Sequence, residues 1–212
     1  MEQTGTARRR LTRVESQRRT REHLLTAAAD VFSRRGFHAA SVEEVAEAAG
    51  YSKGAVYSNF ASKDDLFLAL LDRHLAQELA AVAHRVAPDP ARADGLAEPP
   101  HPFSRHLEEG RTWNILAMEF WLYAMRDERA RERLAARYRA ARGDLAARLR
   151  GQDAEGTARS HAAAAPVAWA VLALGLGLAL QAYLEPGVMP RDVYAVAIDR
   201  LLTDPAAACD AE

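Results

Sequence analysis

The sequence predicts an all-α fold in which a small helix-turn-helix domain precedes a larger helical domain. Apolar residues recur three and four positions apart through most of the 212 residues, as they do on one face of an α-helix. Serine caps and glycines follow one another at short intervals between residues 36 and 62, which indicates several short helices there. No segment of useful length alternates apolar and polar residues, so β-strands are not expected.

The first predicted helix ends at Gly36. This glycine has the position of a C-cap, and Phe37 follows it, placed to cover the helix end. The inward face of the helix consists of Leu24, Leu25, Ala28, Val31 and Phe32. Residues 1–21 hold seven arginines against two acidic side chains, and we assign residues 1–19 to a flexible basic arm. Two roles fit this arm equally well: insertion into a DNA minor groove, and a solvated tail.

Two short helices with a tight turn between them follow. Ser41 and Glu44 form a capping box, in which both side chains satisfy unpaired backbone donors at a helix start. Gly50 ends the first short helix, and Ser52 caps the second. The inward residues of the two helices are Val42, Val45, Ala46 and Ala49, then Val56 and Phe60. With the supporting helix before them, these elements predict a helix-turn-helix domain over residues 20–66.

The tip of the second short helix suggests a function. Because Val56 and Phe60 are expected to face inward, the small residues 52–55 face outward, and a tip with little side-chain bulk fits the major groove of DNA. Gly54 costs about 1 kcal/mol in a helix interior, and close approach to a partner is a reason to accept that cost. The predicted DNA-contacting residues are Ser41, Ser52, Lys53, Gly54, Ala55, Tyr57, Ser58, Asn59 and Lys63.

The larger helical domain is assigned to residues 67–212. A capping box of Ser62 and Asp65 opens a long helix, and five prolines between Pro88 and Pro102 then predict a loop. Further helices are expected over residues 103–125, 126–150, 162–184 and 191–202. The 126–150 helix holds nine arginines and one apolar stripe, which favours a solvated outer face over a second nucleic-acid site.

Residues 162–184 form an uncharged segment that is long enough to span a bilayer. Alanine makes up much of it, Pro166 interrupts it, and no second such segment exists in the sequence. We therefore expect a buried helix and no membrane partner. Gly175 and Gly177 lie in this segment without a preceding strand or a third glycine, so close helix packing is favoured over a dinucleotide-binding loop.

Composition excludes several other classes of protein. A single cysteine, Cys209, cannot form an internal disulfide or a cysteine metal cluster, and the N-terminal arginines precede no apolar signal segment. We therefore expect a cytoplasmic protein. His101 and His106 lack the spacing of metal ligands on a helix face, and no catalytic constellation is visible. No metal, cofactor or enzymatic activity is expected.

The run AADVFSRRGFHAASVEEVAEAAGYSKGAVYSNFASKDDLFLALL, within residues 20–71, resembles the DNA-binding domain of the TetR family of bacterial transcriptional regulators. Its Gly-Phe, Ser-Val-Glu-Glu-Val-Ala, Gly-Tyr-Ser-Lys-Gly-Ala-Val-Tyr and Phe-x-Ser-Lys-x-x-Leu motifs follow the order and spacing of that family. In many members the position of Ser58 is aromatic and that of Asn59 is histidine, and this sequence departs from the pattern there.

The resemblance implies an all-helical homodimer whose C-terminal domain encloses a small-molecule effector. Aromatic and methionine side chains crowd residues 113–125, where they form either ordinary core or the lining of a pocket. The candidate pocket residues are Phe103, His106, Trp113, Met118, Trp121, Leu122, Met125, Trp169 and Tyr183. The resemblance makes the last two helices the dimer interface, with Gly175, Gly177, Leu180, Tyr194 and Ile198 as candidates.

We therefore expect a ligand-responsive transcriptional regulator, in the first instance a repressor, that binds a near-palindromic operator in double-stranded DNA as a homodimer. Release from DNA would follow binding of a small molecule of unknown identity. Two alternatives remain: a DNA-binding protein that responds to no ligand and, less favoured, an enzyme that uses the C-terminal aromatic cluster.

Overall fold

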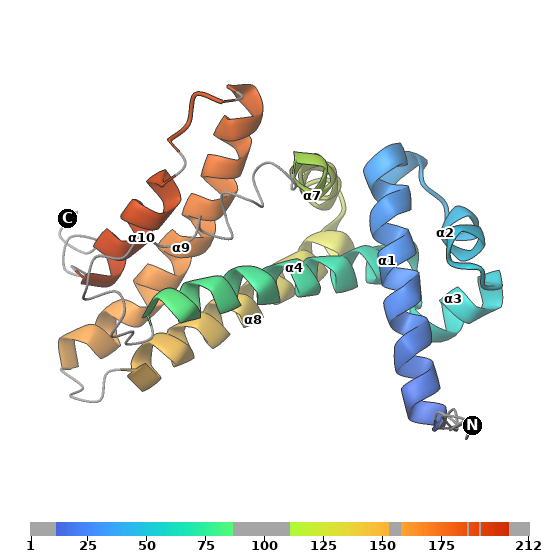
Figure 1. Ribbon diagram of the computed structural model, residues 1–212, viewed down its shortest axis with the longest axis horizontal. Helices are drawn as coiled ribbons and strands as arrows, with labels where there is room; N and C mark the ends of the chain where they lie inside the picture. The colour runs from blue at the N-terminus through green and yellow to red at the C-terminus, as the bar shows by residue number, and fades with distance from the viewer. Residues whose placement is uncertain (1–11, 87–110, 153–157, 186, 191, 204–212) are drawn as a thin grey trace, which may run out of the picture. The chain divides into compact units, whose positions relative to one another are not determined.

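A computed structural model describes residues 12–86, 111–152, 158–185, 187–190 and 192–203, and the chain divides into two units between Leu70 and Leu71. The described residues form helices and no strand, in agreement with the all-α prediction (Figure 1). In chain order the helices are α1 (Arg13–Ala39), α2 (Val42–Ala49), α3 (Lys53–Asn59), α4 (Lys63–Val86), α7 (Arg111–Ala124), α8 (Glu128–Gln152), α9 (Ala158–Leu184) and α10 (Val193–Thr203).

Helix α1 begins earlier than expected. Thr12 Oγ1 accepts a hydrogen bond from the Glu15 backbone N–H at 3.2 Å, and the Glu15 carboxylate accepts one from the Thr12 N–H at 2.7 Å. This capping box starts the helix at Arg13, so residues 13–19 are helical and do not belong to a flexible arm. The arginines before them lie outside the described residues. The Thr-x-x-Glu signature was present in the sequence and would have placed the helix start correctly.

Gly36 interrupts α1 as predicted. Its φ of 75° and ψ of 166° lie outside the helical region, so the chain kinks there. A short helical stretch follows the kink and ends at Ala39. Phe37 is buried directly after this break, with ring centroids 6.0 Å from Phe32 and 5.5 Å from Phe67. The aromatic cluster therefore joins the end of α1 to the start of α4 in the core of the first unit.

Lys63 lies at the same junction. Its ammonium donates hydrogen bonds to the carbonyl oxygens of Phe37, His38 and Ala40 at 2.8, 3.2 and 3.1 Å. These three bonds use all the donors of an ammonium group. Burial lowers the pKa of Lys63. Lys63 was predicted to hold a DNA phosphate, but in this structure its charge instead satisfies carbonyls around the end of α1.

The second unit is built around the α8–α9 pair, with α7 packed on both helices and α10 packed on α9 (Figure 1). Phe120, Leu145 and Val171 come from three of these helices and are almost completely buried. The helices α8, α9 and α10 begin within a few residues of their predicted starts. The predicted loop between Pro88 and Pro102 lies outside the described residues, as do Phe103 and His106.

Helix α9 differs from the expectation of a helix buried on every side. Its segment Ala164–Leu184 is long and apolar enough to cross a membrane, yet only a third of its most apolar stretch is buried by the described protein. Trp169, Leu180, Tyr183 and Leu184 are exposed, and Val196 of α10 is half exposed. The protomer therefore covers one side of α9 and leaves apolar surface on another.

The contacts of Lys63 predict a change in stability. Lys63→Met keeps the length of the side chain but leaves three carbonyls without a donor, so the free energy of unfolding should fall by about 1–3 kcal/mol. Thermal and urea denaturation measure this change. Lys53→Met is the matched control, because Lys53 is exposed and should leave stability nearly unchanged. If Lys63→Met unfolds like the parent protein and only DNA affinity falls, the predicted phosphate contact is its main role.

Candidate functional site

The turn between α2 and α3 requires glycine. Gly50 has φ 72° and ψ 30°, the left-handed conformation that other residues rarely adopt. Its N–H is bonded to the carbonyls of Ala46 and Glu47, and the Tyr51 N–H is bonded to Ala46 O at 2.9 Å. These bonds close α2 and set the direction in which α3 leaves. The turn is thus the tight glycine turn that the sequence predicted.

Helix α3 buries one face and exposes its tip. Val56 is 1% exposed and Phe60, directly after the helix, is 4% exposed. Ser52 caps the helix by accepting a hydrogen bond from the Ala55 N–H at 3.2 Å. The residues at the start of α3, from Ser52 to Gly54, are exposed, as predicted.

Gly54 is not required by packing inside the protein. A Cβ atom built at this position would meet only Ser52 Oγ, at 3.8 Å, which is an ordinary van der Waals distance. Its φ is not in the left-handed region, so backbone strain does not select glycine either. The lack of a side chain at Gly54 therefore leaves room on the outer surface of the tip.

Lys53 forms an ion pair with Glu43 of α2, which the sequence analysis did not foresee. The hydrogen bond between them lowers the pKa of Glu43 and raises that of Lys53. Both side chains are more than half exposed, and the Lys53 ammonium lies 5.8 Å from the ring centroid of Tyr57. A polyanion that approaches the tip therefore competes with Glu43 for the Lys53 charge.

Ser58 and Asn59 turn their donors back to their own helix. The Ser58 hydroxyl and the Asn59 amide both donate to Ala55 O, at 2.9 and 2.8 Å. The backbone carbonyl of Asn59 accepts a hydrogen bond from Arg21 Nη1 at 3.1 Å, and the Arg21 guanidinium lies 4.3 Å from the ring centroid of Phe60. The predicted DNA contacts of Ser58 and Asn59 would require these local bonds to be exchanged.

Ser41 forms the predicted capping box with Glu44. Ser41 Oγ accepts from the Glu44 N–H at 3.1 Å, and the Glu44 carboxylate accepts from the Ser41 N–H at 2.8 Å. These bonds lower the pKa of Glu44, which also pairs with Arg35 at 3.3 Å. Of the predicted DNA-contacting residues, the exposed ones are Ser52, Lys53, Gly54, Tyr57 and Ser58, whereas Ser41, Ala55, Asn59 and Lys63 are partly buried.

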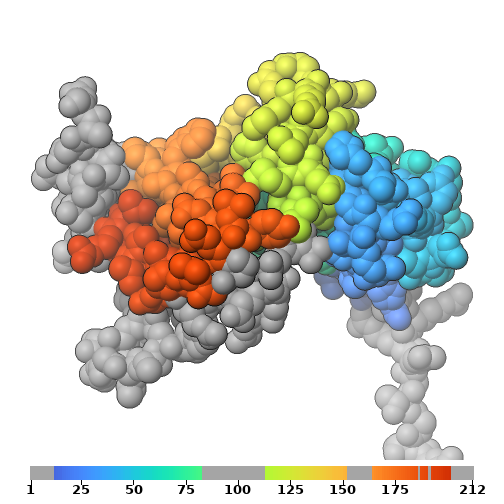
Figure 2. Space-filling view, turned by 90° about the horizontal axis from the view of Figure 1, so that it is seen from above, coloured from blue at the N-terminus to red at the C-terminus, as the bar shows by residue number. Residues whose placement is uncertain are grey.

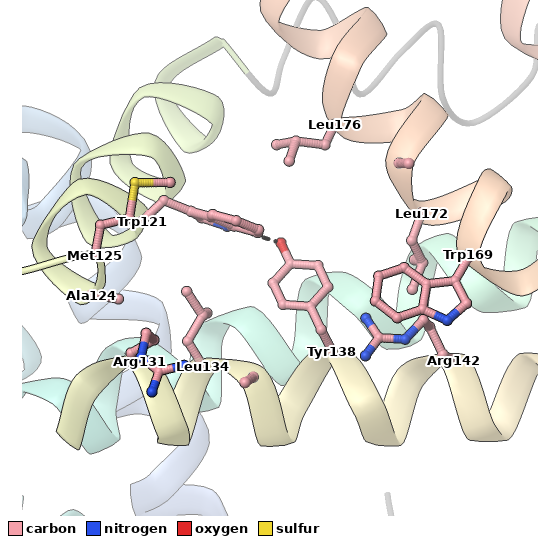
Figure 3. Close-up of a pocket in the computed structure, with 12 residues that line it drawn as sticks. Trp121, Ala124, Met125, Arg131, Leu134, Tyr138, Arg142, Trp169, Leu172 and Leu176 are labelled. Atoms are coloured by element: carbon pink, nitrogen blue, oxygen red, sulfur yellow. Dashed lines mark hydrogen bonds between the residues drawn. The ribbon is translucent and has the colours of Figure 1, made fainter. Parts of the chain in front are cut away.

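The second unit contains an apolar cavity of about 420 Å³ between α7, α8 and α9 (Figure 3). This volume lies in the range of ligand pockets in proteins, about 300–1,000 Å³. The residues that line it are Trp121, Ala124, Met125, Arg131, Leu134, Ala135, Tyr138, Arg142, Trp169, Leu172, Ala173 and Leu176.

The polar groups of the cavity come mainly from α8. Trp121 Nε1 donates to the Tyr138 hydroxyl at 3.3 Å, drawn as a dashed line in Figure 3, and the two rings meet edge to face. Burial raises the pKa of Tyr138. On the other side of the cavity the Arg142 guanidinium lies 3.5 Å from the ring centroid of Trp169.

The cavity includes three of the predicted pocket residues, Trp121, Met125 and Trp169. Four others are not part of its lining: Trp113 stacks on His74, Met118 is half-buried elsewhere on α7, and Leu122 and Tyr183 are exposed. Tyr138 and Arg142 were missed because the arginine-rich helix was interpreted as a solvated face. Spacing places them together on α8, since residues four apart share a helix face.

Two predicted dimer contacts are buried inside the protomer. Tyr194 is 4% exposed and Ile198 is fully buried in the same unit, so neither is available to a partner chain. Gly175 is also buried. Gly177 and Leu180 keep exposed surface, and a Cβ built at Gly177 would meet no atom within 4 Å. Among the described residues no cluster of histidine, cysteine or carboxylate side chains could hold a metal ion.

Comparison with known proteins gives matches to both units. Residues 24–70 match the family model described as bacterial regulatory proteins, tetR family. Residues 104–205 match the model described as BetI-type transcriptional repressor, C-terminal. The HTH-type transcriptional activator FasR of Mycolicibacterium smegmatis is 51% identical over 55 residues, which are 26% of this chain. That match spans only a quarter of the length of FasR, which limits it to the DNA-binding region.

Solved structures match over nearly the whole chain. A transcriptional regulator from Rhodococcus sp. Rha1 is 30% identical with a TM-score of 0.55, and the match covers 91% of this chain and 98% of that one. Salmonella enterica GusR is 22% identical with a TM-score of 0.60, over 92% of this chain and 97% of GusR. The second likeness supports the fold alone.

The Lys53–Glu43 ion pair predicts a gain in DNA affinity on substitution. Glu43→Gln releases Lys53 to a phosphate, so affinity for duplex DNA should rise and its dependence on salt should steepen by about one counterion. Glu47→Gln is the matched control, since it removes one exposed negative charge from the same helix without an ion pair to Lys53. Fluorescence anisotropy at several salt concentrations measures both. Equal changes in the two variants would show that Lys53 does not contact DNA.

Proposed function

We propose that this chain, which belongs to the TetR family of bacterial transcriptional regulators, is a cytoplasmic, homodimeric repressor that a small molecule releases from its DNA operator. We favour repression because the C-terminal half matches a model described as a transcriptional repressor. The activator FasR is similar only in the DNA-binding region, which does not distinguish the two modes of regulation.

The observation that carries the proposal is the exposed tip of α3 within the region that matches the tetR model. Its first residues present little side-chain bulk, and Gly54 leaves space that the protein itself does not use. We propose that this tip enters the major groove, where Lys53 and Tyr57 supply phosphate or base contacts. DNA contacts are less favoured for four other predicted residues, because their polar groups already form hydrogen bonds within the protein. These residues are Ser41, Ser58, Asn59 and Lys63.

The dimer is proposed from the apolar surface that α9 and α10 leave uncovered. These helices lie side by side, and their surface is continuous in the space-filling view (Figure 2). The exposed apolar side chains on and between them are Leu180, Tyr183, Leu184, Val188 and Val196. A second copy with the same surface would bury them in a symmetric interface. Such a dimer would present two tips to half-sites about 34–36 Å apart on DNA.

Release by a ligand is proposed from the cavity and from α4. Helix α4 begins in the first unit and continues past Leu70 into the second, where Asp72 pairs with Arg137 of the cavity-lining helix α8 at 3.4 Å. A ligand that displaces α8 would therefore act on α4. Coupling between two sites amounts typically to about 1–3 kcal/mol. A protein that responds to no ligand would not need this cavity, so the inducible function is favoured.

Gel-shift and anisotropy measurements on the DNA that flanks its own coding region test the function. The parent protein should bind a near-palindromic segment there and prefer it to unrelated DNA. Gly54→Ala should lower operator affinity by about tenfold, or ~1.4 kcal/mol, because the added methyl group separates tip and groove. The variant's free energy of unfolding should stay equal or rise by up to about 1 kcal/mol.

The control is Gly143→Ala on α8, where an added Cβ meets no atom within 4 Å. It should leave DNA affinity unchanged. Binding of all DNA sequences with equal affinity, or a Gly54→Ala protein that binds the operator normally, would contradict the proposed tip.

The exposed surface of α9 and α10 predicts the effect of a charge on assembly. Val196→Glu would place a carboxylate in the proposed interface, so the dissociation constant of the dimer should rise by about tenfold or more. Leu122→Glu is the matched control, because both residues are 50% exposed but Leu122 lies on α7. Analytical ultracentrifugation measures both variants. A monomeric parent protein, or equal weakening by the two substitutions, would exclude this interface.

A further inference from the structure

Among the described residues that line the cavity, the charged side chains are both basic. They are Arg131 and Arg142. Arg131 is paired with Glu128, so its charge is compensated. Arg142 has no carboxylate partner within the part of the chain that the structure describes. Desolvation and, after it, the neighbouring Arg139 lower the pKa of Arg142.

The hydrogen-bonding groups of the cavity are mainly donors. The Tyr138 hydroxyl accepts from Trp121 Nε1, which leaves its own proton to donate. Tyr138 and Arg142 are four residues apart on α8 and so project from the same helix face (Figure 3). A ligand between them would meet an O–H and a guanidinium, which is the donor set that binds a carboxylate.

Aromatic side chains alone would also fit a quaternary ammonium cation, which binds to the faces of tryptophan and tyrosine rings. In this cavity the Arg142 guanidinium already covers a face of Trp169. A second cation there would be repelled by Arg142, and none of the described lining residues carries a carboxylate. The charge of Glu78, which also raises the pKa of Tyr138, comes from outside this lining. The arrangement therefore selects against cations.

We propose that the cavity binds an amphipathic carboxylate, a molecule with an apolar tail and one carboxylate group. The carboxylate is held by Arg142 and the Tyr138 hydroxyl, and the tail lies along Leu134, Leu172 and Leu176. This assignment rests on the proposed function, because it names the chemical class of the effector.

Calorimetric titration of the full chain without DNA tests the ligand class directly. Three probes carry a ten-carbon chain and differ in the head group: decanoate, decanol and decyltrimethylammonium. The two ionic probes are used below their micelle concentrations, and decanol is used below its solubility limit. Decanoate should bind at least about tenfold more tightly than decyltrimethylammonium, with decanol between them. Tighter binding of the cation, or no binding by any of the three, would overturn the proposal.

Two variants locate the head group. Arg142→Met should lower decanoate affinity by about tenfold and leave decanol affinity within about twofold, and Tyr138→Phe should lower decanoate affinity severalfold. Arg131→Met is the matched control, because Arg131 lines the same cavity with its charge already paired. Unchanged decanoate affinity in Arg142→Met would overturn the proposal. The comparison of the three probes uses the parent protein, so it remains a valid test even where a variant does not fold.

Binding and DNA release are separate readouts, so the two proposals fail separately. Decanoate that binds through Arg142 but leaves the operator complex intact supports the ligand class and contradicts release by this ligand. An operator complex that dissociates only with cationic compounds supports the inducible function and contradicts the carboxylate site.

Discussion

Burial of Val56 and Phe60 is the interaction on which the DNA-binding unit depends. A seven-residue helix has no independent stability in water, because nucleation of a helix costs more than so few hydrogen bonds return. These two side chains attach α3 to the core of the unit. The residues at the start of the helix, from Ser52 to Gly54, are exposed and need not pack against the core, so two of the three can be as small as serine and glycine.

The two lysines of the chain show how differently one residue type can be used within eleven positions. The Lys63 ammonium is hydrogen-bonded to three backbone carbonyls and lies over the ring of Phe37, so its charge interacts with groups of the protein itself. Lys53 is exposed and paired with Glu43, an interaction that water and salt screen. A phosphate can replace Glu43 at small cost, whereas removing Lys63 from its carbonyls would leave three acceptors unsatisfied.

Local signals in the sequence predicted the DNA-binding unit well, because caps, glycine turns and inward positions depend on residues only a few positions apart. Ser41, Gly50 and Ser52 all have the predicted roles. The cavity could not be predicted in the same way. Its lining comes from three helices, and periodicity does not specify which of their faces meet. In the sequence, Arg142 is only one of nine arginines on a polar helix. In the structure, the packing of α8 on α9 places it against Trp169.

In the proposed function, helix α9 has two roles: it lines the ligand cavity, and it forms part of the dimer surface. Four leucines follow one another along α9 at intervals of four residues. The first two, Leu172 and Leu176, line the cavity, and the last two, Leu180 and Leu184, are exposed. The four leucines follow one helical stripe, so a single rigid element passes from the cavity to the proposed dimer surface. A ligand that shifts the first half of α9 must then also move the second half. In the proposed dimer, such a movement would change the spacing of the two recognition tips, although neither tip contacts the ligand.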